Sequence, residues 1–296
     1  MQIDEIKDQI CDVCHKMWQL GWVAANDGNV SVRLDDGTFL ATPTGMSKSF
    51  ITPDKLLRID ASGNILEGAE GLRPSSEIKM HMRCYEKRDD VRAVVHAHPP
   101  TATGFAVAHR PMDMYNMIED VAAIGAVPLT PYGTPSTTEV PDAIEPYLNE
   151  HDVMLLENHG ALAVGSDVIT AYYRMESLEL WAKITLNAIL LGGSYDIDRK
   201  NIDKLINLRS YYHITGKHPG YKKFERQDEG EPTDKYAQTK GFKILSNKIE
   251  IYINRKRGYL CYIQRLESAR LLMDAGAVYV KVLKLRLWQW QRMQRS

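Results

Sequence analysis

Three histidines stand where a predicted strand meets a turn, and together they could bind a metal ion. His96 and His98 are separated by one residue at the end of the β-branched run 91–95, and Pro99 follows them. Alternate residues of a strand share a face and lie about 7 Å apart along the backbone, so both imidazoles could reach one ion. His159 follows a second apolar run. Three imidazoles with an open fourth position are typical of catalytic zinc, and the alternative is ordinary core or surface histidines.

Glu77 is the candidate general acid or base. It follows Pro74-Ser75-Ser76 at the predicted start of a helix. A carboxylate beside a metal can shuttle a proton if its pKa lies near the working pH. The alternative is a charge that only stabilises the first turn of the helix.

Hydroxyl groups and loop amides of the kind that bind phosphate oxygens occur in three short segments. The segments are Asn26 to Asn29, Thr42-Pro43-Thr44-Gly45 and Ser75-Ser76. Each could equally be an ordinary turn or cap, because Ser, Thr, Asn and Gly are the usual residues there. The sequence contains no Walker or dinucleotide-binding fingerprint.

The hydrophobic periodicity predicts helices and strands whose ends carry these candidate residues. A first helix is expected to end near Gly21, and a second to start at about Ser75 with Glu77 in its first turn. Asp167 is predicted to cap a long amphipathic helix that ends at Leu191. The predicted strands are residues 30–34, 38–41, 91–95, 153–156 and 161–164.

The cysteines point to a reducing compartment. Four cysteines in 296 residues do not form the dense disulfide framework of small secreted domains. Cys11-Asp12-Val13-Cys14-His15 matches the C-x-x-C-H pattern of haem attachment, but apolar residues every three to four positions place it inside a helix. Because the N-terminus also resembles no signal peptide and no run is long enough to span a bilayer, we expect a cytoplasmic protein.

The charge is unevenly distributed along the chain. The formal net charge of -1 gives no reason to expect a nucleic-acid or membrane partner. Residues 241–296 nevertheless carry twelve Lys or Arg against three Asp or Glu. Residues 225–240 are polar and read as a linker, so 241–296 is predicted to be a basic extension. Within it we expect a short strand at 249–253 and a helix-like stretch at 266–275.

Five motifs occur in one order along the chain: Gly28-Asn29-Val30-Ser31-Val32-Arg33, Thr42-Pro43-Thr44-Gly45, Pro74-Ser75-Ser76-Glu77, His96-Ala97-His98-Pro99 and Asn158-His159-Gly160. In order and approximate spacing they resemble the class II aldolase/adducin family, particularly its fuculose-phosphate aldolase branch, over about residues 1–220. The resemblance implies an α/β fold in residues 1–224, a three-layer α/β/α domain around a mainly antiparallel sheet. It also implies a homotetramer with active sites at the subunit interfaces.

The resemblance further implies roles for the candidate residues. His96, His98 and His159 would bind one zinc ion per subunit, and Glu77 would approach the metal and then accept and donate the proton. The implied reaction is cleavage of a ketose 1-phosphate, such as L-fuculose 1-phosphate, to dihydroxyacetone phosphate and a short aldehyde through a metal-stabilised enediolate. The implied phosphate-binding residues are Gly28, Asn29, Thr44, Gly45, Ser75 and Ser76.

One departure from the family pattern concerns the acid that protonates the leaving aldehyde. The family has a tyrosine after the metal-binding strand, but the corresponding position here looks like Met117, and Tyr115 two residues away is the candidate. A second tyrosine near the family's C-terminus could correspond to Tyr211, Tyr212 or Tyr221, which leaves the aldehyde product open.

The same family also contains ribulose-phosphate 4-epimerases, a methylthioribulose-phosphate dehydratase, sugar-acid-phosphate decarboxylases and non-catalytic adducins. Ribulose-phosphate 4-epimerases typically place Asp where this chain has Glu77, which favours the aldolase over the epimerase, and sugar-acid-phosphate decarboxylases remain an alternative. An adducin-like binding module is disfavoured by the joint presence of three histidines and Glu77. The basic extension is no part of the family pattern, so it could dock onto an unknown protein, bind a polyanion or lack a selected role.

Overall fold

The computed structural model describes residues 2–225, 242–245, 248–251, 270–274 and 277–281, and divides the chain into two compact units, residues 1–227 and 228–296. In the second unit, β9 (Phe242–Leu245) pairs with β10 (Lys248–Ile251) and β11 (Arg270–Asp274) with β12 (Ala277–Lys281), both antiparallel. β10 confirms most of the strand predicted at 249–253. The helix-like prediction for 266–275 is wrong over 270–274, because the β-branched segment of β12 offers that stretch a pairing partner.

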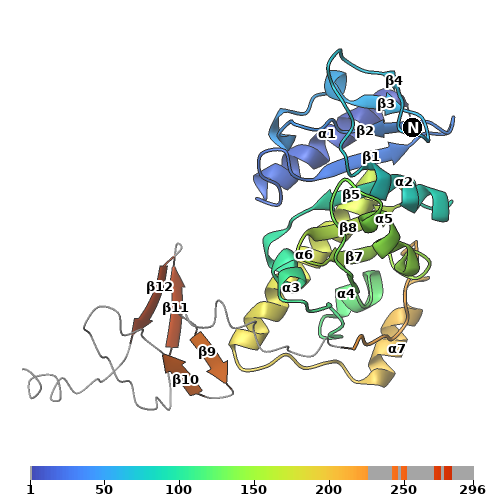
Figure 1. Cartoon of the computed structure of the whole chain (residues 1–296). Coiled ribbons are helices and arrows are strands. Elements are labelled where there is room, and N and C mark those ends of the chain that lie inside the picture. Colours follow the sequence, from blue (N-terminus) through green and yellow to red (C-terminus); the bar gives the residue numbers. More distant parts are fainter. Residues whose placement is uncertain (1, 226–241, 246–247, 252–269, 275–276, 282–296) are drawn as a thin grey trace, which may run out of the picture. The chain divides into compact units, whose positions relative to one another are not determined.

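An eight-stranded sheet forms the centre of the first unit, in the order β4-β3-β2-β1-β5-β8-β7-β6 (Figure 1). Every neighbouring pair is antiparallel except β6 with β7, which confirms the mainly antiparallel sheet. The strands are β1 (Asn29–Arg33), β2 (Phe39–Ala41), β3 (Leu57–Ile59), β4 (Ile65–Glu67), β5 (Ala93–Ala97), β6 (Leu129–Thr130), β7 (Val153–Leu156) and β8 (Gly160–Gly165).

Helices cover both faces of this sheet, which confirms the three-layer architecture. Side chains of α1, α3 and α6 pack in one core with Val95 of β5 and Ala163 of β8. Side chains of α2 and α5 pack in a second core with Val94 and Leu162, the neighbouring residues of the same strands. The helices are α1 (Ile3–Gln19), α2 (Ile78–Lys87), α3 (Pro100–Val107), α4 (Ile118–Ala123), α5 (Glu139–Ile144), α6 (Val168–Leu190) and α7 (Arg199–Asn207), with short 3-10 helices η1 (Lys48–Phe50), η2 (Pro53–Lys55) and η3 (Glu145–Tyr147).

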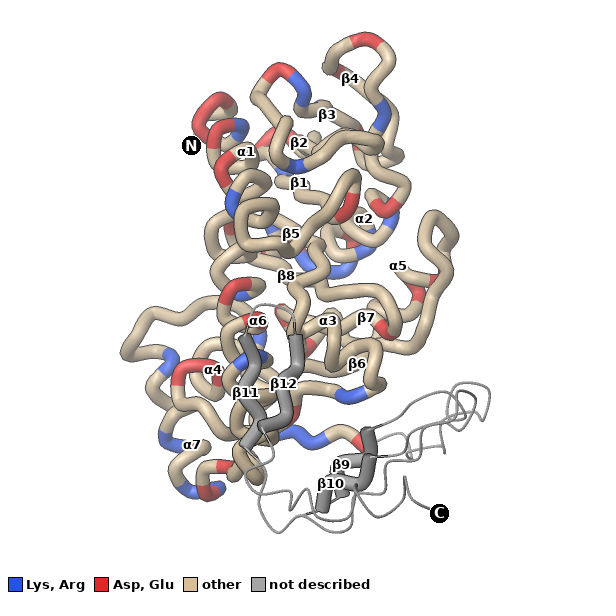
Figure 2. Tube along the Cα trace, turned by 90° about the vertical axis from the view of Figure 1, so that its left-hand side faces the viewer, with Lys and Arg blue, Asp and Glu red and all other residues tan. Residues whose placement is uncertain are grey.

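Strands β5 and β8 carry no Lys, Arg, Asp or Glu, and Figure 2 draws them in tan. This composition follows from burial on both faces, because an unpaired charge inside the sheet would be costly. No helix in the described part of the chain is long and apolar enough to cross a membrane.

Three local predictions can be compared with the helices. Asp167 caps α6 as expected, and its side chain accepts a hydrogen bond of 2.7 Å from the amide of Thr170. The helix expected from Ser75 instead begins at Ile78, with Glu77 at its N-cap position. The C-x-x-C-H segment lies inside α1, where Cys14 is fully buried, so that its placement in a helix is confirmed.

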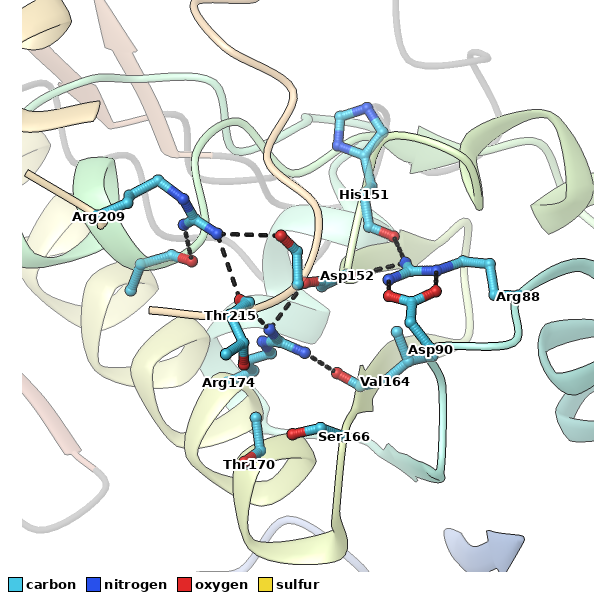
Figure 3. A network of polar contacts seen from close by, with 12 residues as sticks. Arg88, Asp90, His151, Asp152, Val164, Ser166, Thr170, Arg174, Arg209 and Thr215 are labelled. Atoms are coloured by element: carbon cyan, nitrogen blue, oxygen red, sulfur yellow. Dashed lines mark hydrogen bonds and ion pairs between the residues drawn. The ribbon is translucent and has the colours of Figure 1, made fainter. Parts of the chain in front are cut away.

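A buried group of ion pairs fastens the segment after α7 to the sheet (Figure 3). Asp152 lies beside the start of β7 and pairs with Arg88 at 2.6 Å and with Arg174 of α6 at 2.8 Å. Arg174 also donates to the carbonyl of Thr215 at 2.8 Å, and Arg209 donates to the same carbonyl at 3.3 Å. Removing one partner of such a buried pair is strongly destabilising, because it leaves an uncompensated charge.

Gly216 provides a test of this anchor. It has φ +87°, and an added Cβ would overlap the carboxylate of Asp152 and the guanidinium of Arg174. We expect Gly216→Ala to lower the free energy of unfolding by about 3 kcal/mol, combining left-handed backbone strain with a disturbed buried ion pair. Denaturant titration of the free energy of unfolding measures this loss.

Gly220→Ala is the matched control for Gly216→Ala. Gly220 has φ +67°, but no atom lies within 4 Å of its added Cβ. Only the backbone strain of about 1 kcal/mol is therefore expected. Equal losses in the two variants would show that the ion pairs do not depend on the shape of this turn.

Candidate metal centre and active site

Three adjacent strands bring the predicted site residues to one edge of the sheet. Asn29 at the start of β1 stands opposite His96 near the end of β5, and Ala97 stands opposite Ala161 of β8. His159 belongs to the turn between β7 and β8, where Asn158 has φ +53°. Strands β1 and β8 both run antiparallel to β5. Each of them therefore begins beside His96, where β5 ends.

The three predicted metal ligands converge. The ring centroids of His96, His98 and His159 lie 4.7 to 5.3 Å apart, and one nitrogen of each ring lies within 4.8 Å of the other two. Nε2 of His98 is 3.3 Å from Nε2 of His96. This separation suits two ligands of a single ion better than two unrelated core histidines.

The contacts of His96 and His98 outside the cluster leave one nitrogen of each ring facing it. Nδ1 of His96 lies 2.9 Å from the carbonyl oxygen of Ala161, to which it can only donate, so its Nε2 carries the lone pair. Nδ1 of His98 lies 3.7 Å from a carboxylate oxygen of Asp27. Such outer partners fix the ring orientation and tautomer of metal-binding histidines.

Glu77 joins the same cluster from the other side. Oε1 lies 3.1 Å from Nε2 of His159, and Oε2 lies 3.4 Å from Nε2 of His96. Oε2 also accepts a hydrogen bond of 2.8 Å from the Asn29 amide. Three imidazole nitrogens and a carboxylate form a donor set that suits a divalent transition metal, zinc above all.

Burial sets the protonation of the site. Desolvation lowers the pKa of His96 and of His98, because the low-dielectric surroundings disfavour imidazolium. Neutral imidazoles are the form that binds metal. Burial raises the pKa of Glu77, but its interactions with His96, His159 and Asn29 outweigh burial and lower it. These shifts favour neutral rings at His96 and His98 beside an ionised carboxylate at Glu77.

The predicted phosphate-binding segments lie beside this cluster. Nδ2 of Asn29 donates to Ser75 Oγ at 3.2 Å as well as to Glu77. The amide of Thr44 donates to the carbonyl of Arg73 at 2.8 Å, next to Pro74, which links the second segment to the third. Gly28 and Asn29 are buried, Thr44 and Ser75 are half-buried, and Gly45 and Ser76 are exposed.

Within the described residues, none of the hydrogen bonds of Tyr115 joins it to the histidine cluster. Its hydroxyl bonds to the carbonyls of Gly220 at 3.1 Å and Lys222 at 2.9 Å, and its ring stacks on Tyr221 at 4.6 Å. Only 2% of the residue is exposed, whereas Tyr211 and Tyr212 are largely exposed. Its role as a proton donor stays a prediction, and its observed contacts fasten the segment 220–222.

Two residues that the sequence analysis missed support the cluster from a distance. Glu179 of α6 accepts hydrogen bonds from the amides of Thr101 and Ala102 at 2.9 to 3.0 Å, which holds the turn after His98. His81, fully buried one turn after Glu77, lies 2.7 Å from Ser31 Oγ of β1. The spacing of four residues between Glu77 and His81 was the only signal in the sequence that could have indicated His81. No sequence signal indicated Glu179.

Gly160 tests the geometry of the metal ligands. A Cβ at this position would overlap the His98 ring and would lie 2.6 Å from the carbonyl oxygen of Ala97. We expect Gly160→Ala to shift His98 and weaken Zn²⁺ or Co²⁺ affinity at least tenfold, since small displacements of a ligand are costly. Competition with a chromogenic chelator measures the affinity.

The control for Gly160→Ala is Gly104→Ala in α3, where no atom lies within 4 Å of the added Cβ. It is expected to bind metal as the unaltered chain does. If Gly160→Ala folds and keeps the full metal affinity, His98 is not a ligand in the observed arrangement.

Known proteins match the part of the chain that carries these residues. The sequence profile of the family described as Class II Aldolase and Adducin N-terminal domain matches residues 8–186. An L-fuculose phosphate aldolase of Methanocaldococcus jannaschii is 32% identical over 187 residues, which are 62% of this chain and 98% of that protein. One of Escherichia coli O6:H1 is 32% identical over 64% of this chain and 87% of that protein.

Solved structures agree with this result. An L-fuculose 1-phosphate aldolase superimposes with a TM-score of 0.65 at 26% identity, covering 71% of this chain and 98% of that one. A protein of Escherichia coli described as a putative aldolase/epimerase/decarboxylase superimposes with a TM-score of 0.62 at 26% identity, covering 68% and 98%.

Proposed function

We propose that this protein cleaves a ketose 1-phosphate like L-fuculose 1-phosphate. The chain belongs to the Class II Aldolase and Adducin N-terminal domain family and is one of its aldolases. The products are dihydroxyacetone phosphate and a short aldehyde. The observation that carries the proposal is the convergence of His96, His98 and His159 on the carboxylate of Glu77. This arrangement unites a cation site with a proton carrier.

The proposed cofactor is one zinc ion per subunit, held by His96, His98 and His159, with Glu77 beside it in the resting enzyme. Bound zinc supplies a Lewis acid that stabilises negative charge on the substrate oxygens. The protein's own contribution is orientation, since the Ala161 carbonyl and Asp27 hold the rings of His96 and His98.

Glu77 is the proposed proton carrier. In cleavage, the hydroxyl group beside the breaking carbon-carbon bond loses a proton, the electron pair of that bond remains on the dihydroxyacetone phosphate half as an enediolate, and the other half leaves as the aldehyde. Glu77, which is ionised at rest, takes up one proton and gives it to the carbon of the enediolate, so that the proton lost and the proton gained balance; in condensation it removes the same proton. The Asn29 amide, which bonds to Oε2, orients the carboxylate.

The phosphate group is proposed to bind at Gly28, Asn29, Thr44, Gly45, Ser75 and Ser76. Support comes from Asn29, whose amide bonds to both Ser75 and Glu77 and so ties the phosphate segments to the proton carrier. The acid on the aldehyde side is proposed to be Tyr115, whose hydroxyl must then leave its bonds to Gly220 and Lys222.

The remaining proposals concern assembly and location. A cytoplasmic homotetramer is proposed from the family resemblance, and the free thiols of Cys11, Cys14 and Cys84 are compatible with a reducing compartment. Residues 1–224 are proposed as the catalytic domain, residues 225–240 as a linker and residues 241–296 as a basic extension.

The first test is the reaction itself. We expect the zinc-loaded protein to release dihydroxyacetone phosphate from L-fuculose, L-rhamnulose or 5-deoxyribulose 1-phosphate, and we expect a chelator to abolish the release. A coupled dehydrogenase assay measures the ketone product, and mass spectrometry identifies the aldehyde. Conversion of a pentulose phosphate to its epimer, or release of carbon dioxide from a sugar-acid phosphate, would replace the aldolase with the epimerase or decarboxylase.

Glu77→Gln tests the proton carrier separately from the metal. The amide keeps the size of the side chain but cannot accept the proton, so we expect kcat to fall by about 10² to 10⁴. Metal analysis is expected to show that three imidazoles still hold the ion. A variant with full metal content and unchanged kcat would exclude Glu77 as the acid and base.

A further inference from the structure

Lys48 is buried beneath the proposed phosphate segments. Only 1% of its surface is exposed, which places it among the largest fully buried side chains of the described residues. Its ammonium donates to the carbonyl of Met46 at 3.1 Å and to that of Asn26 at 3.4 Å. A lysine with both partners on the backbone is unusual, because a buried charge is normally paired with an opposite charge.

No carboxylate of the described residues lies within 4.0 Å of this ammonium. Desolvation lowers the pKa of Lys48, and the nearby Cys14, Asp27 and Glu77 oppose that shift. The protein therefore buries a positive charge without an ion pair of its own. A neutral side chain with N–H groups could join the same two carbonyls without the cost of desolvating a charge.

The two carbonyls belong to the segments that are proposed to bind phosphate. Asn26 lies two residues before Gly28, and Met46 directly follows Gly45. The six proposed phosphate-binding residues are all uncharged, so none of them compensates a phosphate dianion. Asp27 and Glu77 add negative charge to the same region, so a positive charge there favours the binding of an anion.

We propose that Lys48 is a positioning residue of the phosphate subsite, which joins the two segments through Asn26 and Met46 and supplies the positive charge for the substrate phosphate. This inference rests on the proposed function. The negative charge of the bound phosphate compensates the positive charge of Lys48. In turn, Lys48 offsets the repulsion between the phosphate and the carboxylates of Asp27 and Glu77.

Lys48→Gln separates the charge from the hydrogen bonds, because the amide keeps two N–H donors. We expect it to raise the Kd of inorganic phosphate and the KM of the phosphorylated ketose by about 10- to 100-fold, which is the contribution of a charge-assisted contact. Zinc affinity and kcat are expected to change less than threefold. Calorimetry measures the phosphate affinity, and steady-state kinetics with the full-length, zinc-loaded protein separates KM from kcat.

Lys55→Gln is the matched control, since Lys55 is a partly exposed lysine of the neighbouring η2 whose ammonium donates to the carbonyl of Phe50 at 2.7 Å. It is expected to bind phosphate as the unaltered protein does. If Lys48→Gln does not fold, Lys48→Met replaces it, because methionine fills a similar volume without a charge, and the same loss of phosphate affinity is expected.

The outcomes distinguish this inference from the function on which it rests. If the unaltered protein binds phosphate and a folded Lys48 variant binds it equally well, Lys48 has a structural role only and the inference is overturned. If the unaltered, zinc-loaded protein binds neither inorganic phosphate nor dihydroxyacetone phosphate, the proposed phosphate subsite fails, and the inference fails with it.

Discussion

The antiparallel pairing of β5 with β1 and β8 is the constraint on which the site depends. Strand β5 delivers His96 and His98 to one edge of the sheet, and its register places Asn29 and Ala161 beside His96. A slip of one residue would turn each side chain of β5 to the opposite face and carry both histidines away from Glu77. The apolar cores on both faces fix the register, because Val94 and Val95 each fit only one of them.

The same burial that fixes the strands also prepares the chemistry. Burial favours the neutral form of His96 and of His98 by lowering their pKa values, and the carbonyl of Ala161 orients the ring of His96. The cluster therefore places imidazole nitrogens in the form that binds metal close to the carboxylate of Glu77.

The sequence was informative where the chemistry is local. The apolar run predicted strand β5, which carries His96 and ends directly before His98, and Asp167 was recognisable as a cap from its place before a periodic run. The sequence could not predict contacts between residues that are far apart along the chain. Glu179 accepts a hydrogen bond from Thr101, which is 78 residues away, and Tyr115 bonds to Gly220 and Lys222. Such pairs leave no periodic signal, and the start of α2 was misplaced because Ser75 and Ser76 both resemble caps.

Two kinds of buried charge occur in this domain, and they differ in what compensates them. Asp152 is compensated within the chain by Arg88 and Arg174, so that group can serve stability alone and needs no ligand to explain it. Within the described residues the hydrogen-bond partners of Lys48 are backbone carbonyls, and Glu77 faces His96, whose neutral form burial favours. In the function proposed above, a cation at Glu77 and an anion near Lys48 would complete these charges, and their desolvation cost would then contribute to binding specificity.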